Sequence, residues 1–194
     1  MAVFKKWEVS ISDTDILIHL DEADCLHVLN LLFDKVIIPK RIEWELQRKG
    51  KNTIFRIRKA INSSSGTIFN IVDKEQDKLL KRQVDINFQR FINYIDAGEA
   101  ECCGYASALG VPIIISDNTS DHGIMEQEFI VLTSRDILAL AVFLGILPKK
   151  DAESYYDKIN ENLTYGSRYM FDESYDRSIS RIREKGWHVF LGFE

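Results

Sequence analysis

The chain has 194 residues, of which 45% are apolar and 28% are charged, and its net charge is -5. This is enough apolar sequence for one sizeable domain, and the negative balance excludes a protein drawn to nucleic acid by its overall charge. No apolar run approaches the ~20 residues of a membrane-spanning helix, so we expect no membrane partner.

Strand-like and helix-like patterns alternate between residues 8 and 146. Short apolar or alternating runs, typical of strands, occupy residues 8–12, 36–39, 67–72, 111–116 and 130–134. Apolar residues at three- and four-residue spacing predict helices between these runs. The alternation favours an α/β fold, a doubly wound parallel sheet. The run at 111–116 is too uniformly apolar for a half-exposed strand and fits the sheet interior.

Pro148 and the charged residues after it mark a predicted boundary between a domain at 1–148 and a C-terminal helical extension at 149–194. Two amphipathic helices are expected in this extension, at 152–163 and 172–185. The tail from Trp187 to Phe193 is unusually apolar. We expect it to pack back on the domain, with a partner-binding patch as the alternative.

The N-terminus, MAVFKKWEVS, lacks the apolar stretch of a secretory signal. The three cysteines include an adjacent pair, and their spacing suits neither a disulfide framework nor a zinc motif. Both features favour a reducing cytoplasm. We expect the cysteines to be small buried apolar side chains rather than nucleophiles.

Four acids stand out on independent grounds. Asp13 follows the first predicted strand and Asp117 follows the fourth, and ligands of open α/β sheets bind at the carboxyl ends of strands. Glu45 and Glu99 lie on helix faces that are expected to turn inward. Burying several carboxylates together is costly without a cation, because each raises the pKa of the others. Oxygen ligands alone suit Mg²⁺ or Mn²⁺.

Other polar residues near these acids rank lower. Asp15 and Asp121 are second-rank metal candidates, and Asn118 offers a neutral oxygen ligand or a group that positions water. Glu43 and Glu101 are expected to point away from the inward faces of their helices, since each lies two residues from an inward-facing acid.

A basic segment interrupts the otherwise acidic chain, with no acid between Leu46 and Ile61. Its basic residues are Arg48, Lys49, Lys51, Arg56, Arg58 and Lys59. A solvated helix end and loop is one interpretation, and a phosphate-binding rim is the other. Trp44 and Phe55 flank the segment; stacking on bases is possible chemistry for them, but core packing is the simpler expectation.

The four histidines are dispersed, and no pair has a metal-binding spacing. We expect packed or surface histidines rather than ligands. The exception is His122, which lies beside Asp121 and is a candidate for substrate contact.

Four short motifs, in their order along the chain, resemble the PIN-domain nucleases. They are Ser12–Thr14, Val36–Pro39 followed by Glu45–Leu46, Asp96–Glu101, and Ile115–Asn118. The resemblance covers residues 9–146 and is nearest to a bacterial branch akin to the toxins of toxin–antitoxin pairs. It implies a PIN-like fold in which Asp13, Glu45, Glu99 and Asp117 bind metal, with Asp121 as a fifth ligand. Asp15 departs from the family pattern, which usually has a small hydroxyl residue there.

The chemistry that this resemblance implies is metal-dependent hydrolysis of RNA phosphodiesters by an endoribonuclease. One or two Mg²⁺ or Mn²⁺ ions would bind the scissile phosphate and lower the pKa of a bound water. A carboxylate would take a proton from that water. The implied partners are RNA, an antitoxin protein and a second copy of the chain.

Two alternatives compete with a nuclease. Asp13–Asp15 and Ser116–Asp121 resemble the first and last motifs of haloacid-dehalogenase-type phosphatases, in which the first Asp is a phosphorylated nucleophile. Against this alternative, Leu17 replaces the expected hydroxyl or valine, and Glu45 and Glu99 would have no role. The other alternative is a non-catalytic PIN-fold interaction module.

Overall fold

The computed structural model describes residues 4–63, 66–163 and 167–193. Its centre is a five-stranded parallel sheet with the strand order β3-β2-β1-β4-β5. The strands are β1 (Ser10–Ser12), β2 (Val36–Pro39), β3 (Phe69–Val72), β4 (Ile113–Ile115) and β5 (Ile130–Leu132). The predicted doubly wound parallel sheet is therefore confirmed; β2 has the predicted bounds, and the other four strands are shorter than their sequence patterns.

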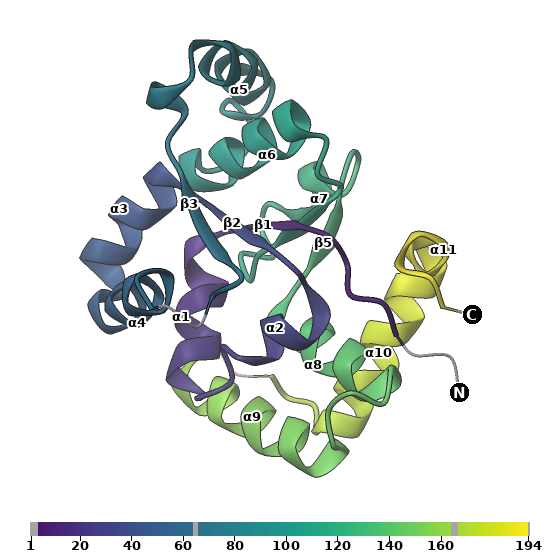
Figure 1. The fold of residues 1–194 in the computed structure, drawn as a ribbon. Helices are drawn as coiled ribbons and strands as arrows, with labels where there is room; N and C mark the ends of the chain where they lie inside the picture. Colours follow the sequence, from purple (N-terminus) through teal and green to yellow (C-terminus); the bar gives the residue numbers. More distant parts are fainter. Residues whose placement is uncertain (1–3, 64–65, 164–166, 194) are drawn as a thin grey trace.

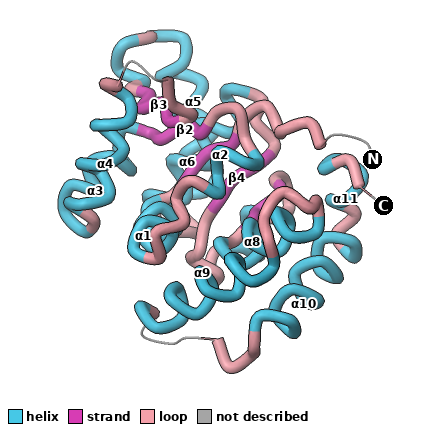
Figure 2. Tube along the Cα trace, turned by 60° about the horizontal axis from the view of Figure 1, so that its bottom comes forward, coloured by secondary structure: helices cyan, strands magenta, loops and turns pink. Residues whose placement is uncertain are grey.

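Helices cover both faces of this sheet (Figures 1 and 2). On one face α6 (Ala97–Leu109) packs against β1, β2 and β4, and α5 (Lys78–Phe91) packs on α6. On the other face lie α1 (Thr14–Glu22), α2 (Val28–Leu32) and α8 (Ser134–Phe143). At the β3 edge, α3 (Lys40–Lys49) and α4 (Lys51–Ile61) pack against each other. Two short elements complete this part, a 3₁₀ turn at Lys74–Gln76 and α7 (His122–Met125).

The central strands are apolar along their whole length because both of their faces are covered. Ile11 of β1 pairs in register with Ile37 of β2 and with Ile114 of β4, and these side chains are buried. A strand that is covered on two faces has no polar alternation, as expected for a parallel sheet. The core therefore lies on both sides of β1, and β1 stands at the centre of the sheet.

Two acids that were expected to point away from the core are buried. Glu101 is 5% exposed because α6 is covered by the sheet on one side and by α5 on the other, and it pairs with Lys74 at 3.0 Å. Glu43 is 3% exposed and pairs with Lys40 and Arg58, each at 2.6 Å. Helix periodicity assumes one covered face, so it is wrong for helices that neighbours enclose on two sides.

The C-terminal residues pack onto the sheet domain. In this region α9 (Lys149–Asn162) packs against α1 and α8, and α10 (Phe171–Glu184) packs against α8 and α9. These helices agree with the predicted pair, while the division at residue 148 stays a prediction. Among the described residues, no helix combines the length and the apolar content needed to cross a bilayer.

The apolar tail forms a short helix, α11 (Trp187–Leu191), beside the first residues of the chain (Figure 1). Trp187 and Leu191 are buried, and the indole Nε1 of Trp7 donates a hydrogen bond to the carbonyl of Leu191 at 3.1 Å. The expected packing of the tail is therefore confirmed for its inner face. Val189 and Phe190, on its outer face, remain exposed.

Candidate functional site

The candidate site lies where the central strands β1 and β4 end. Asp13 directly follows β1, and Asp117 and Asn118 follow β4, the neighbour of β1 in the sheet. Strand order reverses direction at β1, and such a switch point opens a crevice at the carboxyl ends of the strands. The sequence of the chain thus places acids at the position where this architecture binds ligands.

A cavity of about 330 Å³ opens at this point. The side chains that line it are mostly acidic or polar, with two bases at its lip. They include Asp13, Thr14, Asp15, Glu45, Arg48, Lys49, Asp96, Glu99 and Asn118. Three of the four principal predicted acids, Asp13, Glu45 and Glu99, therefore meet in one cavity together with Asn118. Asp117 and Asp121 do not line it.

Asp13 is the most buried acid of the cavity, at 3% exposed. Burial first, and then the negative charge of Glu99, raises the pKa of the Asp13 carboxyl well above its usual value. Glu99 is 5% exposed, and burial raises the pKa of its carboxyl as well, although a hydrogen bond from Asn118 at 2.7 Å opposes the rise. Among the described residues no basic side chain forms an ion pair with either acid. Two buried carboxylates without a cation fit a divalent metal.

Glu45 extends from α3 into the cavity, where its carboxylate lies against the first turn of α6. The hydroxyl of Thr14 donates a hydrogen bond to Glu45 Oε2 at 3.0 Å. A Cβ atom at Gly98 would lie 3.2 Å from Glu45 Oε1, tighter than ordinary van der Waals contact. Glycine at position 98 therefore permits the carboxylate of Glu45 to sit against the first turn of α6.

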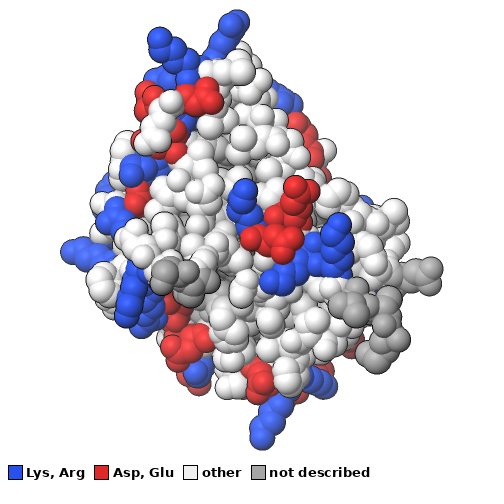
Figure 3. Space-filling view, in the orientation of Figure 1, with Lys and Arg blue, Asp and Glu red and all other residues white. Residues whose placement is uncertain are grey.

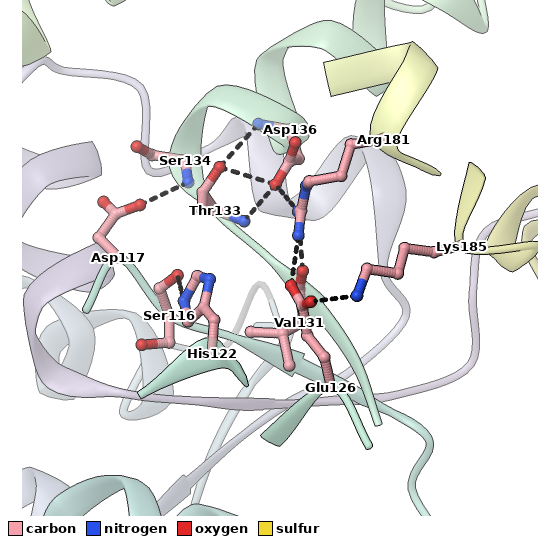
Figure 4. A network of polar contacts seen from close by, with 10 residues as sticks. All are labelled: Ser116, Asp117, His122, Glu126, Val131, Thr133, Ser134, Asp136, Arg181 and Lys185. Carbon is pink, nitrogen blue, oxygen red and sulfur yellow. Dashed lines mark hydrogen bonds and ion pairs between the residues drawn. The ribbon is translucent and has the colours of Figure 1, made fainter. Parts of the chain in front are cut away.

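Asp117 is bonded away from the cavity. His19 Nδ1 lies 2.7 Å from Asp117 Oδ2, and the backbone N–H of Ser134 donates to Asp117 Oδ1 at 2.7 Å (Figure 4 shows the bond to Ser134). Burial lowers the pKa of His19, but the hydrogen bond and charge of Asp117 outweigh it, so the pKa is raised. His19 and Asp117 are 98 residues apart, so no local sequence pattern indicates their pairing.

A second group of acids lies at the start of α6. Asp96, Glu99 and Asp121 each place a carboxylate oxygen within 4.8 Å of the other two, an arrangement able to hold a metal ion. The backbone N–H of Asp96 donates to Asp121 Oδ2 at 3.0 Å. Asp96 is not among the metal ligands predicted from the sequence. Its place at the N-cap of α6, one turn before Glu99, is the signal that could have identified it.

The cysteines are buried as expected, and His122 lies outside the cavity. All three cysteines are fully buried, and burial raises the pKa of Cys25 to about 12, which keeps it an unreactive thiol. His122 does not reach the cavity: it is 7% exposed, and its Nε2 lies 3.2 Å from the Ser116 carbonyl (Figure 4). Burial, and then the positive charge of Arg181, lowers the pKa of His122. The suggested substrate contact of His122 is therefore wrong.

The basic segment divides into two groups on α3 and α4. Lys and Arg side chains gather along the left edge of Figure 3, over these two helices. Arg48 and Lys49 line the cavity, whereas Arg56 pairs with Asp21 at 2.8 Å and Arg58 pairs with Glu43. A second hollow of about 470 Å³ shares Arg48 and Lys49 with the first cavity and extends past Lys51 and Arg56. Lys59 is exposed and lines neither.

These features define an α/β protein with a metal-type acidic cavity at the switch point of its sheet. A family model described as a PIN domain matches residues 9–184, and the chain belongs to that family. The match extends through α9 and into the last turn of α10, beyond the part in which the sequence motifs lie. No curated protein and no solved structure matches the chain. PIN domains are generally nucleases, and membership of this family argues against the haloacid-dehalogenase alternative.

Proposed function

We propose that the chain is an Mg²⁺- or Mn²⁺-dependent endoribonuclease that hydrolyses phosphodiester bonds of RNA. The observation that carries this proposal is the burial of Asp13 against Glu99 with no basic partner among the described residues. Two buried carboxylates at a strand end repel each other, and a divalent cation that binds between them stabilises the fold by neutralising both charges. Membership of the PIN family supports the same conclusion.

Each cavity residue has a distinct role in this proposal. Asp13 and Glu99 would hold a metal ion in the cavity. Glu99 is shared with the second group of acids, in which Asp96 and Asp121 would hold an ion at the start of α6. Asn118 fixes Glu99 through its 2.7 Å hydrogen bond. When bound, the metal would polarise the scissile phosphate and make a bound water acidic.

Glu45 is the proton acceptor that we assign. It lines the cavity, and its Oε2 accepts a hydrogen bond from Thr14. Its Oε1 pairs with Arg41 Nε at 3.7 Å but accepts no hydrogen bond from the described residues, so it can accept a proton from the attacking water. Arg48 and Lys49, at the lip, would contact the phosphates on either side of the scissile bond.

The metal role of Asp117, the cytoplasmic location, the antitoxin and the homodimer stay predictions. The basic residues beyond the cavity, Lys51, Arg56, Arg58 and Lys59, also remain predicted RNA contacts; the ion pairs of Arg56 and Arg58 favour a structural role for those two. The non-catalytic interaction module is the alternative that the experiment below addresses.

The deciding experiment incubates the purified chain with a mixed RNA pool in Mn²⁺, in Mg²⁺ or in chelator. We expect cleavage only with metal, and loss of cleavage in Asp13→Asn and Glu99→Gln. A matched control is Glu101→Gln, an acid on the same helix that pairs with Lys74 and does not line the cavity. Cleavage that survives in chelator, or in both cavity variants, would rule out the proposed site. Absence of cleavage by the native chain under every condition would favour the interaction module.

A further inference from the structure

The two edges of the sheet differ in how they are closed. At one edge lies β5, whose residues are all buried, and Arg181 of α10 donates a hydrogen bond to the carbonyl of Val131 at 3.0 Å (Figure 4). At the other edge lies β3, in which every residue is partly or fully exposed. The residues of the three inner strands are all buried. β3 is therefore the open edge of the sheet.

The pairing of β3 with β2 fixes which of its backbone groups face outward. Val36 of β2 donates its N–H to the carbonyl of Ile68 at 2.7 Å, and Val36 stands opposite Phe69 in the register. In a parallel ladder, alternate residues direct their backbone groups to alternate sides. Ile68 and Asn70 therefore direct theirs toward β2, and Phe69 and Ile71 direct theirs away from the sheet.

Most of the outward backbone groups have no partner within the chain. The N–H of Phe69 donates to the hydroxyl of Thr67 at 3.2 Å. Although α3 and α4 pack near β3, no hydrogen bond from the described residues reaches the carbonyl of Phe69 or the N–H and carbonyl of Ile71. The strand, Phe-Asn-Ile-Val, contains no proline, lysine or inward-pointing charge, which are the features that commonly prevent edge pairing. The edge of β3 can therefore pair with a further strand.

The charge around β3 favours a second copy of the chain as that partner. No charged residue occurs between Lys59 and Asp73 in the sequence. Two copies that meet along β3 therefore bring no like charges together. A strand of a different protein would find no charge along this edge to select it.

A twofold axis at Asn70 makes the edge complementary to itself. Strands related by such an axis run antiparallel, so Phe69 of one copy stands opposite Ile71 of the other. Because Phe69 and Ile71 are the outward-facing residues, each of these symmetric pairs can exchange both of its N–H···O=C bonds. Each pair also places an aromatic ring against a β-branched side chain, which is a favourable cross-strand contact. The hydrogen bond from Phe69 to Thr67 is the one that such pairing replaces.

We propose that two copies of the chain associate through β3, antiparallel about a twofold axis at Asn70, so that their two sheets join into one continuous sheet. The inference does not depend on the proposed nuclease function, because the acidic cavity lies where β1 and β4 end, in the interior of the sheet. The strands of the two copies run in opposite directions in this dimer, so the two cavities open at opposite ends of the joined sheet.

Charge substitutions at Asn70 test both the interface and its symmetry. Asn70 is exposed and meets its own copy at the axis, so Asn70→Lys places two like charges opposite each other and should weaken dimerisation at least about 10-fold. Asn70→Glu should have the same effect. An equimolar mixture of the two variants should form dimers again, because a lysine then faces a glutamate. Sedimentation velocity at about 1 to 200 µM protein measures all of these species.

Hydrogen exchange locates the interface within the strand. The N–H of Ile71 should exchange quickly in dilute protein and become protected as dimers form, whereas the N–H of Asn70, which faces β2, should be protected at every concentration. Dimerisation that leaves the exchange of Ile71 unchanged would place the interface elsewhere and overturn the proposal.

Asn93→Lys provides the matched control. Asn93 is also exposed, and it lies outside β3, after the end of α5. This variant should dimerise as the native chain does. A native chain that remains monomeric up to about 200 µM overturns the proposal and leaves the edge to a strand of a different protein. A dimer that survives Asn70→Lys, or a mixture of the Lys and Glu variants that stays monomeric, also overturns it.

Discussion

Arg181 of α10 pairs with the buried Asp136 in the first turn of α8, the helix on which α10 packs. Asp136 is 2% exposed and forms the capping box of α8 with Thr133, and Arg181 also donates to the Val131 carbonyl at 3.0 Å and pairs with Glu126 (Figure 4). Ser134, the first residue of α8, donates its backbone N–H to the carboxylate of Asp117. A helix outside the sequence motifs is thereby joined to the strand end that carries the site.

Removal of this arginine should destabilise the fold. Arg181→Met leaves the carboxylate of Asp136 buried without its cation, and we expect the free energy of unfolding to fall by about 2 kcal/mol. The control is Arg177→Met on the same helix, because Arg177 makes an exposed pair with Glu173 that is worth about 0.5 kcal/mol or less. Urea unfolding of both variants measures the difference, and equal losses would contradict the role given to Arg181.

Asp13 should make the metal-free protein sensitive to pH. Its carboxyl has a raised pKa in the fold, because it is buried and faces Glu99, Asp15 and Glu45. The folded state therefore binds more protons than the unfolded chain, and the free energy of unfolding in chelator should fall as pH rises from about 4 through the raised pKa. Asp13→Asn should flatten this decline and raise Tm at pH 7 by at least about 2 °C.

Added metal should restore the stability that the native protein loses at higher pH, and it should not stabilise Asp13→Asn. We expect added Mn²⁺ to raise the Tm of the native protein at pH 7 and to leave the Tm of Asp13→Asn nearly unchanged, since the ion stabilises only a fold that binds it. Differential scanning fluorimetry across pH, with and without chelator, reads both effects. A similar Mn²⁺ shift in the two proteins would contradict metal binding by Asp13.

Substitutions of the two buried acids of α6, Glu99 and Glu101, should have different effects on activity and on stability. Glu99→Gln removes a cavity carboxylate, so cleavage should fall by at least about 100-fold with little loss of stability. Glu101→Gln breaks the pair with Lys74, so the free energy of unfolding should fall by about 1–2 kcal/mol while cleavage persists. Cleavage and unfolding are measured in parallel for both variants. An equal loss of activity in the two variants would contradict this prediction.

The pair of His19 and Asp117 should stabilise the fold in a defined pH range. Because the pKa of His19 is raised in the fold, the stabilisation is complete below the unfolded pKa of about 6.5 and is lost as pH rises through the folded value. His19→Gln should therefore cost about 1 kcal/mol near pH 5.5 and less at pH 9. A difference between variant and native chain that is constant with pH would show that the pKa of His19 is the same in the folded and unfolded states, and would contradict the raised pKa.

Arg48 should account for part of the salt dependence of RNA binding. Neutralising one phosphate contact lowers the slope of log affinity against log salt by about 0.7 for a single strand. We expect this change for Arg48→Ala, measured by filter binding in chelator. The control, Lys150→Ala, removes an exposed lysine on α9 and should leave the slope unchanged. Identical slopes for all three proteins would exclude Arg48 as a phosphate contact.

Local sequence patterns predicted the strands and the acids near their ends, because these depend on short-range rules. An apolar run such as Ile113–Ile115 needs cover on both faces, and an acid at the end of a parallel strand must lie at the carboxyl edge of the sheet. Periodicity was less reliable on helices enclosed by neighbours, and so it misplaced Glu43 and Glu101. The expectation that Trp44 and Phe55 pack in the core is also wrong, since both side chains are exposed.

The amino-acid sequence by itself determined a parallel α/β sheet, the acids that follow β1 and β4, and a basic segment near the second acidic motif. Tertiary structure alone decided that Asp117 bonds to His19, that Asp96 joins the acids of the cavity, and that Arg181 supports α8. Those contacts depend on how distant helices pack, and the direction of a side chain across such a contact follows from the packing of the whole fold rather than from its neighbours in sequence.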